Sequence, residues 1–362
     1  MSQKLFTLGP VEMYEYTKER TLGPLPYFRT EVFSQVNLEC ARRLKRLTGA
    51  PENAHVFLLT CSGTGAMEAV VGGCFCGEDR LLVVDGGGFG HRFAEIAARR
   101  QIPYEAVSFG AGEAFAREGL DRAAKGGNFT GMLVNLHEST TGRLYDKEEL
   151  ASFCRAHGMY FIVDAISSFL ADPLDFELDG ADALIISSQK ALALPPGLAI
   201  AILSDRLWQK IQNQGIEPFS LYFDFIEAEA NAIRGQTPFT PAVGLILALR
   251  DRLEHIEEEG GTAAAVARTK ALAEDFRSRM EILVGRGLLA LPGYPLSNAC
   301  TPILFPAGGA KKVYERLFGE YGVWLNPSGG ELADKALRVG HIGNLTPDDN
   351  AMLAGLLADI LA

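Results

Sequence analysis

The sequence predicts an α/β protein in which helices cover both faces of a mostly parallel sheet, followed by a smaller α/β domain. Two features of the 362 residues support this fold class. Short apolar runs alternate with amphipathic stretches as far as residue 259, and the spacing of the elements changes after Gly260 and Gly261. A hydrophobic content of 48% also supplies enough apolar surface for more than one core.

The elements of the larger part follow one another in a regular order. Apolar runs predict buried strands, and the amphipathic stretches between them predict helices. The predicted strands cover residues 55–60, 80–85, 132–137, 160–165, 183–188 and 197–204. One predicted helix starts near residue 64, and three others cover about residues 90–100, 147–157 and 241–259. Because parallel strands end at one edge of a sheet, we expect a ligand to bind outside these ends.

A glycine pair separates the two parts of the chain, because Gly260 and Gly261 have the character of a helix C-terminal cap. The last helix begins with a hydroxyl cap at Thr346, followed by a proline and two acids. Between these points the sequence predicts helices over 264–285 and 311–321, a strand over 301–305, and strands near residues 323 and 337. We therefore expect an N-terminal segment over 1–20, a large domain over 21–259 and a small domain over 260–362.

Charge and composition argue against several classes of protein. The net charge of −11 argues against nucleic-acid binding, and the basic run at 41–46 is interpreted as one solvated helix face. The apolar stretch 183–203 is broken by Pro-Pro-Gly, so no membrane partner is expected. Cys74 and Cys76 have no second ligand pair nearby, which predicts no metal site. Because the sequence starts without a secretory pattern, we expect a cytoplasmic protein with free thiols.

Two ionisable residues stand at the ends of predicted strands. Lys190 is the only charged residue between 183 and 203, and Asp164 follows four apolar residues. A buried charge is destabilising by several kcal/mol, roughly, unless it is paired or neutralised. For Asp164, a helix cap or an ion pair with a loop is the alternative interpretation. Otherwise, an acid and an amine at the ends of consecutive strands indicate a pair that is kept for its chemistry.

A third strand end reads TCSGTG over 60–65 and leads into a helix. The N–H groups of Ser62, Gly63 and Thr64 would bind an anion, although a plain turn with a hydroxyl cap remains an alternative. The third glycine of the dinucleotide fingerprint and the lysine of the ATP loop are missing, which favours a phosphate monoester. An anion cradle, an acid and a lysine together describe a pyridoxal phosphate site. The cradle binds the phosphate, the acid keeps the pyridine nitrogen protonated, and the lysine forms a Schiff base.

Seven segments resemble those of class V aminotransferases, in the same order and over nearly the whole chain. They are TLGP (7–10), TCSGTGAMEA (60–69), HESTTG (137–142), VDAISS (163–168), SSQKALALPPG (187–197), FTP (239–241) and LRVGHIG (337–343). The sequence is similar to the group of alanine–glyoxylate, serine–pyruvate and 2-aminoethylphosphonate–pyruvate transaminases. This resemblance implies the fold type I architecture of pyridoxal phosphate enzymes.

The resemblance also implies roles for individual residues. At the cofactor these are Lys190 for the Schiff base, Asp164 for the pyridine nitrogen, Ser62, Gly63, Thr64 and Gln189 for the phosphate, Thr140 near the ring hydroxyl, and Phe89 stacked on the ring. Thr240 would reach the phosphate of a neighbouring subunit, which implies a homodimer with shared sites. Thr237 stands where some relatives have a tyrosine. Arg338 would bind the substrate carboxylate, and Gly9 would approach the substrate or form a simple turn.

These roles predict a ping-pong transamination between alanine, serine or 2-aminoethylphosphonate and a small 2-oxo acid, pyruvate or glyoxylate. No second arginine stands in a matched segment, which argues against dicarboxylate substrates. One alternative is a cysteine desulfurase or selenocysteine lyase, but Cys300 lacks basic neighbours in the sequence. Another is a nicotinamide-dependent dehydrogenase, suggested by DGGGFG (85–90) but lacking the ribose-binding acid. His137 and His341 are expected to be structural.

Overall fold

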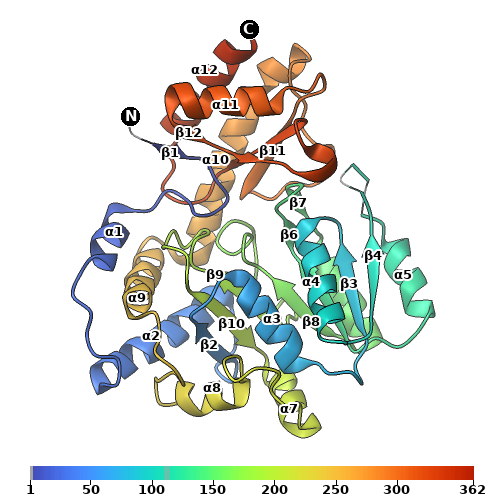
Figure 1. Ribbon diagram of the computed structural model, residues 1–362, viewed down its shortest axis with the longest axis vertical. Helices are drawn as coiled ribbons and strands as arrows, with labels where there is room; N and C mark the ends of the chain where they lie inside the picture. Colours follow the sequence, from blue (N-terminus) through green and yellow to red (C-terminus); the bar gives the residue numbers. More distant parts are fainter. Residues whose placement is uncertain (1–2, 111, 114) are drawn as a thin grey trace.

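The computed structural model describes residues 3–110, 112–113 and 115–362. Within these residues a seven-stranded sheet has the order β2-β10-β9-β8-β5-β3-β4 (Figure 1). The strands are β2 (His55–Leu59), β3 (Leu81–Asp85), β4 (Tyr104–Ser108), β5 (Gly131–Asn135), β8 (Tyr160–Asp164), β9 (Ala183–Ser187) and β10 (Ala199–Leu203). All run in one direction except β10, which is antiparallel to both of its neighbours. The predicted α/β class with a mostly parallel sheet is therefore confirmed.

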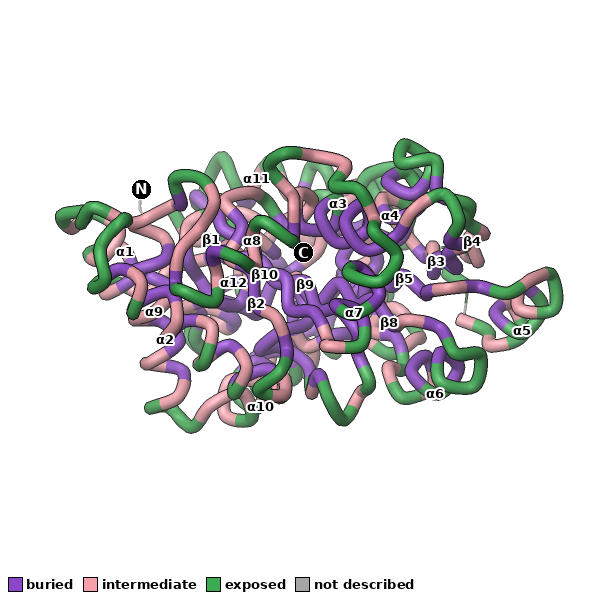
Figure 2. Tube along the Cα trace, turned by 90° about the horizontal axis from the view of Figure 1, so that it is seen from below, coloured by how far each residue is buried: buried purple, intermediate pink, exposed green. Residues whose placement is uncertain are grey.

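Helices cover both faces of this sheet, and Figure 2 shows α3 and α4 on one side of the buried strands and α6 on the other. The first face packs against α3 (Gly63–Cys74), α4 (Gly88–Arg99), α7 (Asp205–Gln214) and α8 (Phe225–Ala232). The second face packs against α2 (Glu31–Thr48), α5 (Arg117–Lys125), α6 (Lys147–His157) and α9 (Val243–Glu258). Successive residues of β3 alternate between the two cores, so Leu81 faces α4 and Leu82 faces the other layer. Burial on both faces explains why the inner strands of the sheet are apolar runs.

A smaller unit with its own core lies at one end of the molecule, where both chain ends are also found (Figure 1). It contains α10 (Gly261–Gly285), β11 (Cys300–Leu304), α11 (Ala310–Tyr321), β12 (Val323–Trp324), β13 (Asn326–Pro327), the 3-10 helix η1 (Gly330–Leu332), β14 (Ala336–Gly340) and α12 (Pro347–Leu361). Strand β1 (Lys4–Leu5) pairs with β12, so the start of the chain packs with its C-terminal part. The domain boundaries over 1–20, 21–259 and 260–362 remain predictions.

Local sequence signals account for several helix ends. Thr346 forms a capping box with Asp349 at the start of α12, with proline in the first turn, as predicted. The side chain of Asp146 accepts hydrogen bonds from two N–H groups at the start of α6, and Gly158 ends that helix in the left-handed conformation. Helix α1 (Glu15–Thr21) and the short strands β6 (His137–Glu138) and β7 (Arg143–Leu144) complete the secondary structure of the described residues.

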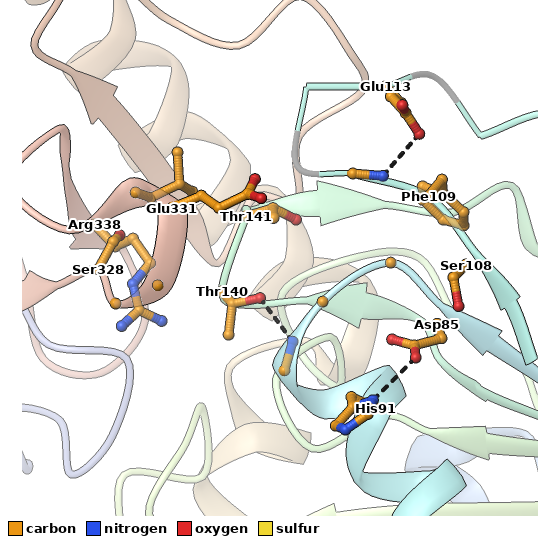
Figure 3. Close-up of a pocket in the computed structure, with 17 residues that line it drawn as sticks. Asp85, His91, Ser108, Phe109, Glu113, Thr140, Thr141, Ser328, Glu331 and Arg338 are labelled. Carbon is orange, nitrogen blue, oxygen red and sulfur yellow. Dashed lines mark hydrogen bonds and ion pairs between the residues drawn. The ribbon is translucent and has the colours of Figure 1, made fainter.

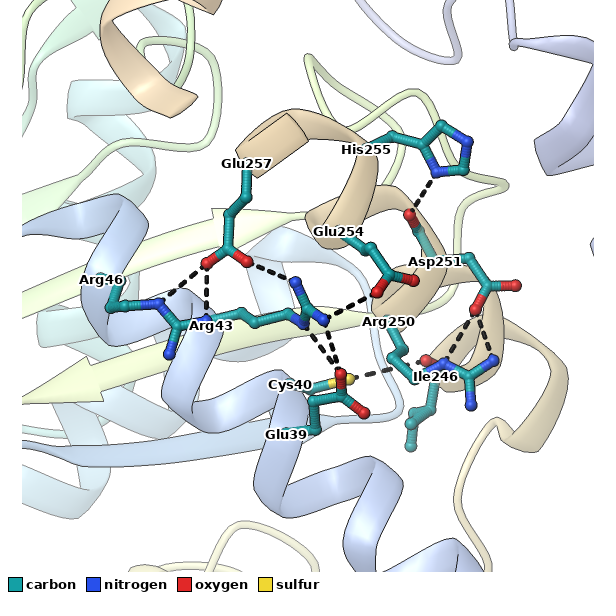
Figure 4. Close-up of polar contacts among 10 residues, drawn as sticks. All are labelled: Glu39, Cys40, Arg43, Arg46, Ile246, Arg250, Asp251, Glu254, His255 and Glu257. Carbon is teal, nitrogen blue, oxygen red and sulfur yellow. Dashed lines mark hydrogen bonds and ion pairs between the residues drawn. The ribbon is translucent and has the colours of Figure 1, made fainter. Parts of the chain in front are cut away.

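The structure contains elements that the sequence did not predict, among them α5, α7 and α8, and two of the differences have a clear physical reason. Strand β4 was not predicted, because it lies at the edge of the sheet and its ends, Tyr104 and Ser108, are exposed, so it lacks a continuous apolar run. The basic run at 41–46 is also more than a solvated face. Arg43 binds Glu39 and Glu254 at 2.7 and 3.0 Å and also contacts Glu257, which joins α2 to α9 (Figure 4).

Two further observations concern the described residues. None of their helices is both long and apolar enough to cross a lipid bilayer. All six cysteines carry free thiols, and four of them are buried.

Candidate active site

The predicted acid and amine stand at the ends of neighbouring parallel strands. Asp164 is the last residue of β8 and is in register with Ile185 of β9, and Lys190 follows the end of β9. The two charges influence each other, because Lys190 lowers the pKa of Asp164 and Asp164 raises the pKa of Lys190. The structure thus brings together the two side chains on which the sequence argument depends.

Burial is the strongest influence on both groups. Asp164 is 5% exposed, and burial raises the pKa of its carboxyl to about 7, although the Ile166 N–H donates to Oδ1 at 2.8 Å. Lys190 is half-buried, and burial lowers the pKa of its amine to about 8. Both pKa values lie close to neutrality, so neither group is held in one protonation state by its surroundings.

Two glycines make close approaches that this arrangement requires. Gly9 has a φ of +138°, and a Cβ there would lie 2.8 Å from Cδ of Lys190. A Cβ on Gly63 would lie 2.5 Å from Cδ1 of Ile166, two residues after Asp164. The N-terminal turn and the start of α3 are therefore packed directly against the Lys190 and Asp164 segments. Gly9 is brought to the site, while its role toward a substrate remains a prediction.

The turn before α3 has the features of an open anion cradle. Ser62 is the N-cap residue, yet its side chain makes no capping hydrogen bond. This argues against the plain hydroxyl cap that the sequence left open, because a capping serine accepts from the helix N–H groups. The side chain of Ser62 is exposed, and the first turn of α3 contains no acidic residue. The N–H groups and the hydroxyl are thus free to bind an anion.

Gln189, between Ser187 and Lys190, is oriented by its neighbour. The Ser187 hydroxyl donates to Oε1 of Gln189 at 2.5 Å. This fixes the amide so that its NH₂ group points away from Ser187, and an NH₂ group is a donor only. The orientation suits the predicted contact with a phosphate, which itself remains untested.

Glu138 is an important residue that the sequence argument missed. Its carboxylate is fully buried and accepts from the N–H groups of Phe89 and Gly90, each at 3.1 Å, and from the side chain of Asn135. It also accepts from the N–H of Thr140 at 3.0 Å and from its hydroxyl at 2.5 Å. Glu138 therefore closes the N-terminus of α4 and holds both Phe89 and Thr140 in place. The available signal was an acid directly after the apolar run MLVNLH.

The hydroxyl of Thr140 is thus already engaged. It donates to Glu138 and accepts from the Gly88 N–H at 3.2 Å, which leaves no hydroxyl proton for a cofactor. The contact predicted between Thr140 and the ring hydroxyl stays a prediction, and in it Thr140 would act as the acceptor unless its hydrogen bond to Glu138 rearranged.

Arg338 lies on β14 and is held by two carbonyl groups. Its Nη1 and Nη2 donate to the carbonyls of Ser139 and Pro327, each at 2.9 Å, while its Nε is buried without a partner among the described residues. Burial lowers the pKa of the guanidinium. A fixed arginine with an unused buried donor can bind a carboxylate.

A cavity of about 750 Å³ extends from Arg338 between the two parts of the molecule. Figure 3 shows Arg338, Ser328 and Glu331 on one side of it, and Asp85 and His91 on the other. Thr140 lies between the two sides, and neither Lys190 nor Asp164 lines the cavity. Arg338, which is predicted to bind the substrate carboxylate, therefore lines this cavity. Thr140 also lines it and connects the cavity to the candidate site.

Thr240 lies on an exposed segment and lines a hollow together with Thr60, which precedes the anion cradle. It stands next to Phe239, whose ring stacks on that of Tyr222 at a centroid distance of 5.4 Å. The hydroxyl of Thr237 donates to the carbonyl of Phe239 at 2.7 Å, so it maintains the turn in this chain. The predicted contact of Thr240 with a second subunit is untested.

His137 and His341, which were expected to be structural, are both buried. Burial lowers the pKa of each to about 3, so both are neutral. His341 contacts the hydroxyl of Thr301 at 2.8 Å. Cys300 is also fully buried, and burial raises the pKa of its thiol to about 12. A protonated, inaccessible thiol cannot act as the nucleophile of a desulfurase.

The glycine run at 85–90 serves packing. A side chain on Gly86 would overlap Tyr145 and Phe109, and one on Gly87 would overlap Thr140. The helix N-terminus that follows already binds the carboxylate of Glu138, so its N–H groups are not available to a dinucleotide.

Comparisons with known proteins bear on the family and the fold. The model of the family Aminotransferase class-V matches residues 37–319. A 2-aminoethylphosphonate–pyruvate transaminase from Vibrio vulnificus is 30% identical over 98% of this chain and 96% of its own length. An L-aspartate–glyoxylate aminotransferase from Paracoccus denitrificans is 27% identical over 97% of this chain and 89% of its own. The structure of alanine–glyoxylate aminotransferase from Nostoc sp. has a TM-score of 0.93 and 25% identity, covering 100% of this chain and 96% of that one.

Proposed function

Because this chain belongs to the class V aminotransferases, which use pyridoxal phosphate, we propose that it transfers an amino group from a small donor to pyruvate or glyoxylate by a ping-pong mechanism. The observation that carries the proposal is the pair of Asp164 and Lys190 at neighbouring strand ends, beside the open N-terminus of α3. The desulfurase and dehydrogenase alternatives are not favoured, because Cys300 is buried and protonated and the α4 N-terminus is occupied.

The residues present fit pyridoxal phosphate. The open cradle at Ser62 offers donors to a phosphate, and Gly63 keeps this cradle close to Asp164. The carboxyl of Asp164 accepts one hydrogen bond among the described residues, from the backbone N–H of Ile166, and burial raises its pKa. A protonated pyridine nitrogen would add a second donor and a positive charge beside this carboxyl.

When it is bound, pyridoxal phosphate supplies a carbonyl group that exchanges for the substrate's amino group and a ring that accepts the released electron pair. Asp164 would hold the proton on the ring nitrogen. The amine of Lys190, with a pKa of about 8, is deprotonated in a usable fraction of molecules near neutral pH and can carry a proton to and from the substrate. Phe89 would support the ring, and Ser62, Thr64 and Gln189 would bind the phosphate.

Arg338 would bind the carboxylate of the oxo acid through its unused Nε and remaining N–H groups. We propose alanine, serine or 2-aminoethylphosphonate as the donor. A carboxylate or a phosphonate each presents two oxygens to a guanidinium, and the relative from Vibrio vulnificus bears the name of the phosphonate donor. Aspartate belongs in the comparison, because the relative from Paracoccus denitrificans is named for it.

A half-reaction screen tests the substrate proposal. Each donor is added alone to the holoenzyme, and the visible absorbance of the bound cofactor is followed for alanine, serine, 2-aminoethylphosphonate, aspartate and glutamate. We expect one of the first three to react fastest. Arg338→Lys should weaken the apparent affinity for pyruvate by about tenfold or more, because the forked contact is lost. Arg316→Lys, on the surface of α11, serves as the control. Glutamate as the best donor would overturn the proposal.

Borohydride reduction tests the role of Lys190. Peptide mapping of the reduced holoenzyme should find the cofactor attached to Lys190, while Lys210, a buried lysine paired with Asp79 at 2.9 Å, should remain unmodified. An adduct at another lysine, or none at all, rejects the assignment.

We also propose a cytoplasmic homodimer with shared sites. Large apolar side chains near Thr240 are exposed, among them Leu221, Tyr222 and Phe239, which supports a contact surface there. Mixing Lys190→Ala chains with Thr240→Ala chains should give hybrids in which one site has both wild-type residues, so activity should exceed that of either variant alone. A fully active monomer in light scattering contradicts the shared site.

A further inference from the structure

Arg92 connects two parts of the candidate site. It lies three residues after Phe89 on α4, so both side chains are on one face of that helix. Its guanidinium carbon is 4.6 Å from the centroid of the Phe89 ring, and its Nη1 donates to Oγ1 of Thr64 at 3.1 Å. A single half-buried side chain therefore spans from the stacking residue on α4 to the anion cradle on α3.

Arginines that lie over aromatic rings differ in whether they also bind an acid. Arg80 and Arg206 each form an ion pair with a carboxylate at 2.9 Å, whereas Arg29, Arg92 and Arg100 form none among the described residues. What distinguishes Arg92 is its hydrogen bond to Thr64 at the anion cradle. Among the described residues, no carboxylate lies within ion-pair distance of Arg92. Its charge nevertheless reaches the site, because it lowers the pKa values of both Lys190 and Asp164. A partly buried guanidinium beside an open helix N-terminus is placed where it can interact with an anionic ligand.

We propose that Arg92 is a positioning residue for the cofactor phosphate, which acts by directing the hydroxyl of Thr64 toward it. This inference rests on the proposed function. The aromatic ring of Phe89 supports the guanidinium and sets its direction.

The chemistry of a hydroxyl group explains the effect. A threonine hydroxyl has one proton, and when Arg92 donates to its oxygen the proton must be donated to a different group. Because Thr64 is in the first turn of α3, a phosphate at the open N–H groups is the acceptor within reach. The positive charge of Arg92 adds to the positive end of the helix and makes the hydroxyl a stronger donor.

The test compares ligands with and without a phosphate. The dissociation constants of pyridoxal phosphate and pyridoxal are measured by equilibrium dialysis on the full-length apoprotein. For Arg92→Met we expect binding of pyridoxal phosphate to weaken by about tenfold or more, and binding of pyridoxal to change less than about twofold. Arg92→Lys, which keeps the charge and one donor, should lie between the wild type and Arg92→Met. Arg100→Met is the matched control, because Arg100 lies over the Phe219 ring at the other end of the same helix.

A double variant tests the route through Thr64. Thr64→Val should weaken the binding of pyridoxal phosphate by a similar factor. The double variant Arg92→Met with Thr64→Val should bind pyridoxal phosphate no more weakly than the single variant that binds it less well. Additive losses would overturn the proposed route, and an equal loss for pyridoxal and pyridoxal phosphate would show a general structural role. A wild-type protein that binds neither ligand would overturn the proposed function together with this inference. If the wild type binds pyridoxal phosphate and Arg92→Met binds it with the same affinity, this inference alone is overturned.

Discussion

Two glycine-rich turns stand at the same edge of the large sheet, one before α3 and one before α4, and they differ in what occupies the helix N-terminus. At α4, the carboxylate of Glu138 accepts from two N–H groups of the first turn. At α3, the N-cap Ser62 makes no side-chain bond to the helix, and its first turn has no acid. Glycine content therefore does not identify an anion site. The site is identified by N–H groups at the start of the helix that have no acceptor within the described residues.

The two buried acids beside these turns differ in the same way. Glu138 accepts hydrogen bonds from backbone and side-chain donors on both oxygens, and its role is complete within the chain. Asp164 accepts one among the described residues, from the N–H of Ile166, and burial raises its pKa to about 7. A buried acid with all its partners supports the fold, whereas one that lacks a partner is prepared for a ligand.

The sharpest test of this contrast replaces each acid by its amide. Asp164→Asn should slow transamination by about a hundredfold, which corresponds to about 3 kcal/mol, because a neutral amide cannot keep the ring nitrogen protonated. Its free energy of unfolding should be no lower than that of the wild type at pH 5, because the folded Asp164 carboxyl is mostly protonated there and resembles the neutral amide. Single-turnover kinetics and urea denaturation measure the two quantities. A rate within twofold of the wild type removes Asp164 from the mechanism.

Glu138→Gln should show the opposite pattern. The amide places an NH₂ group against N–H donors of the α4 turn, so we expect a loss of about 2 kcal/mol in the free energy of unfolding. Urea denaturation of the cofactor-free protein measures it directly. An unchanged midpoint would mean that the α4 turn does not depend on this carboxylate, and the contrast would fail.

The open N-terminus can be tested against a helix whose cap is in use. Ser62→Ala should weaken pyridoxal phosphate binding by about tenfold and change stability by less than about 0.5 kcal/mol, because its hydroxyl caps nothing. Asp146→Ala, which removes the cap of α6, should destabilise the protein by about 1 kcal/mol and leave cofactor affinity unchanged. If Ser62→Ala destabilises the fold as much as Asp146→Ala does, the cradle is a structural cap.

The pH dependence of stability gives a further test of the contrast between the two acids. The pKa of Asp164 rises from 3.8 to about 7 on folding, so between these values the folded chain binds a proton that the unfolded chain has released. Stability of the cofactor-free protein should therefore fall as the pH rises through this window, and Asp164→Asn should lack this contribution. Denaturation curves at several pH values compare the two proteins. Parallel profiles for wild type and Asp164→Asn would contradict the raised pKa.

Much of the fold and the centre of the site could be predicted from local sequence patterns. The apolar runs identified six strands of the large sheet, and the cap at Thr346 identified the last helix. Strand β4 was missed because an edge strand lacks the apolar pattern of a buried one. The basic run on α2 was misinterpreted, because Arg43 finds its acids on α9, more than 200 residues further along the chain.

By itself the sequence determined that a lysine, an acid and a glycine-rich turn meet at one edge, because strand polarity and apolar periodicity are local properties that a parallel sheet converts into a shared edge. Only the tertiary structure decided which of the two helix N-termini is open. Glu138 is 49 residues from Phe89, and Arg92 is 28 residues from Thr64. Contacts across such separations depend on how α4 packs against its neighbours, and no local pattern encodes that packing.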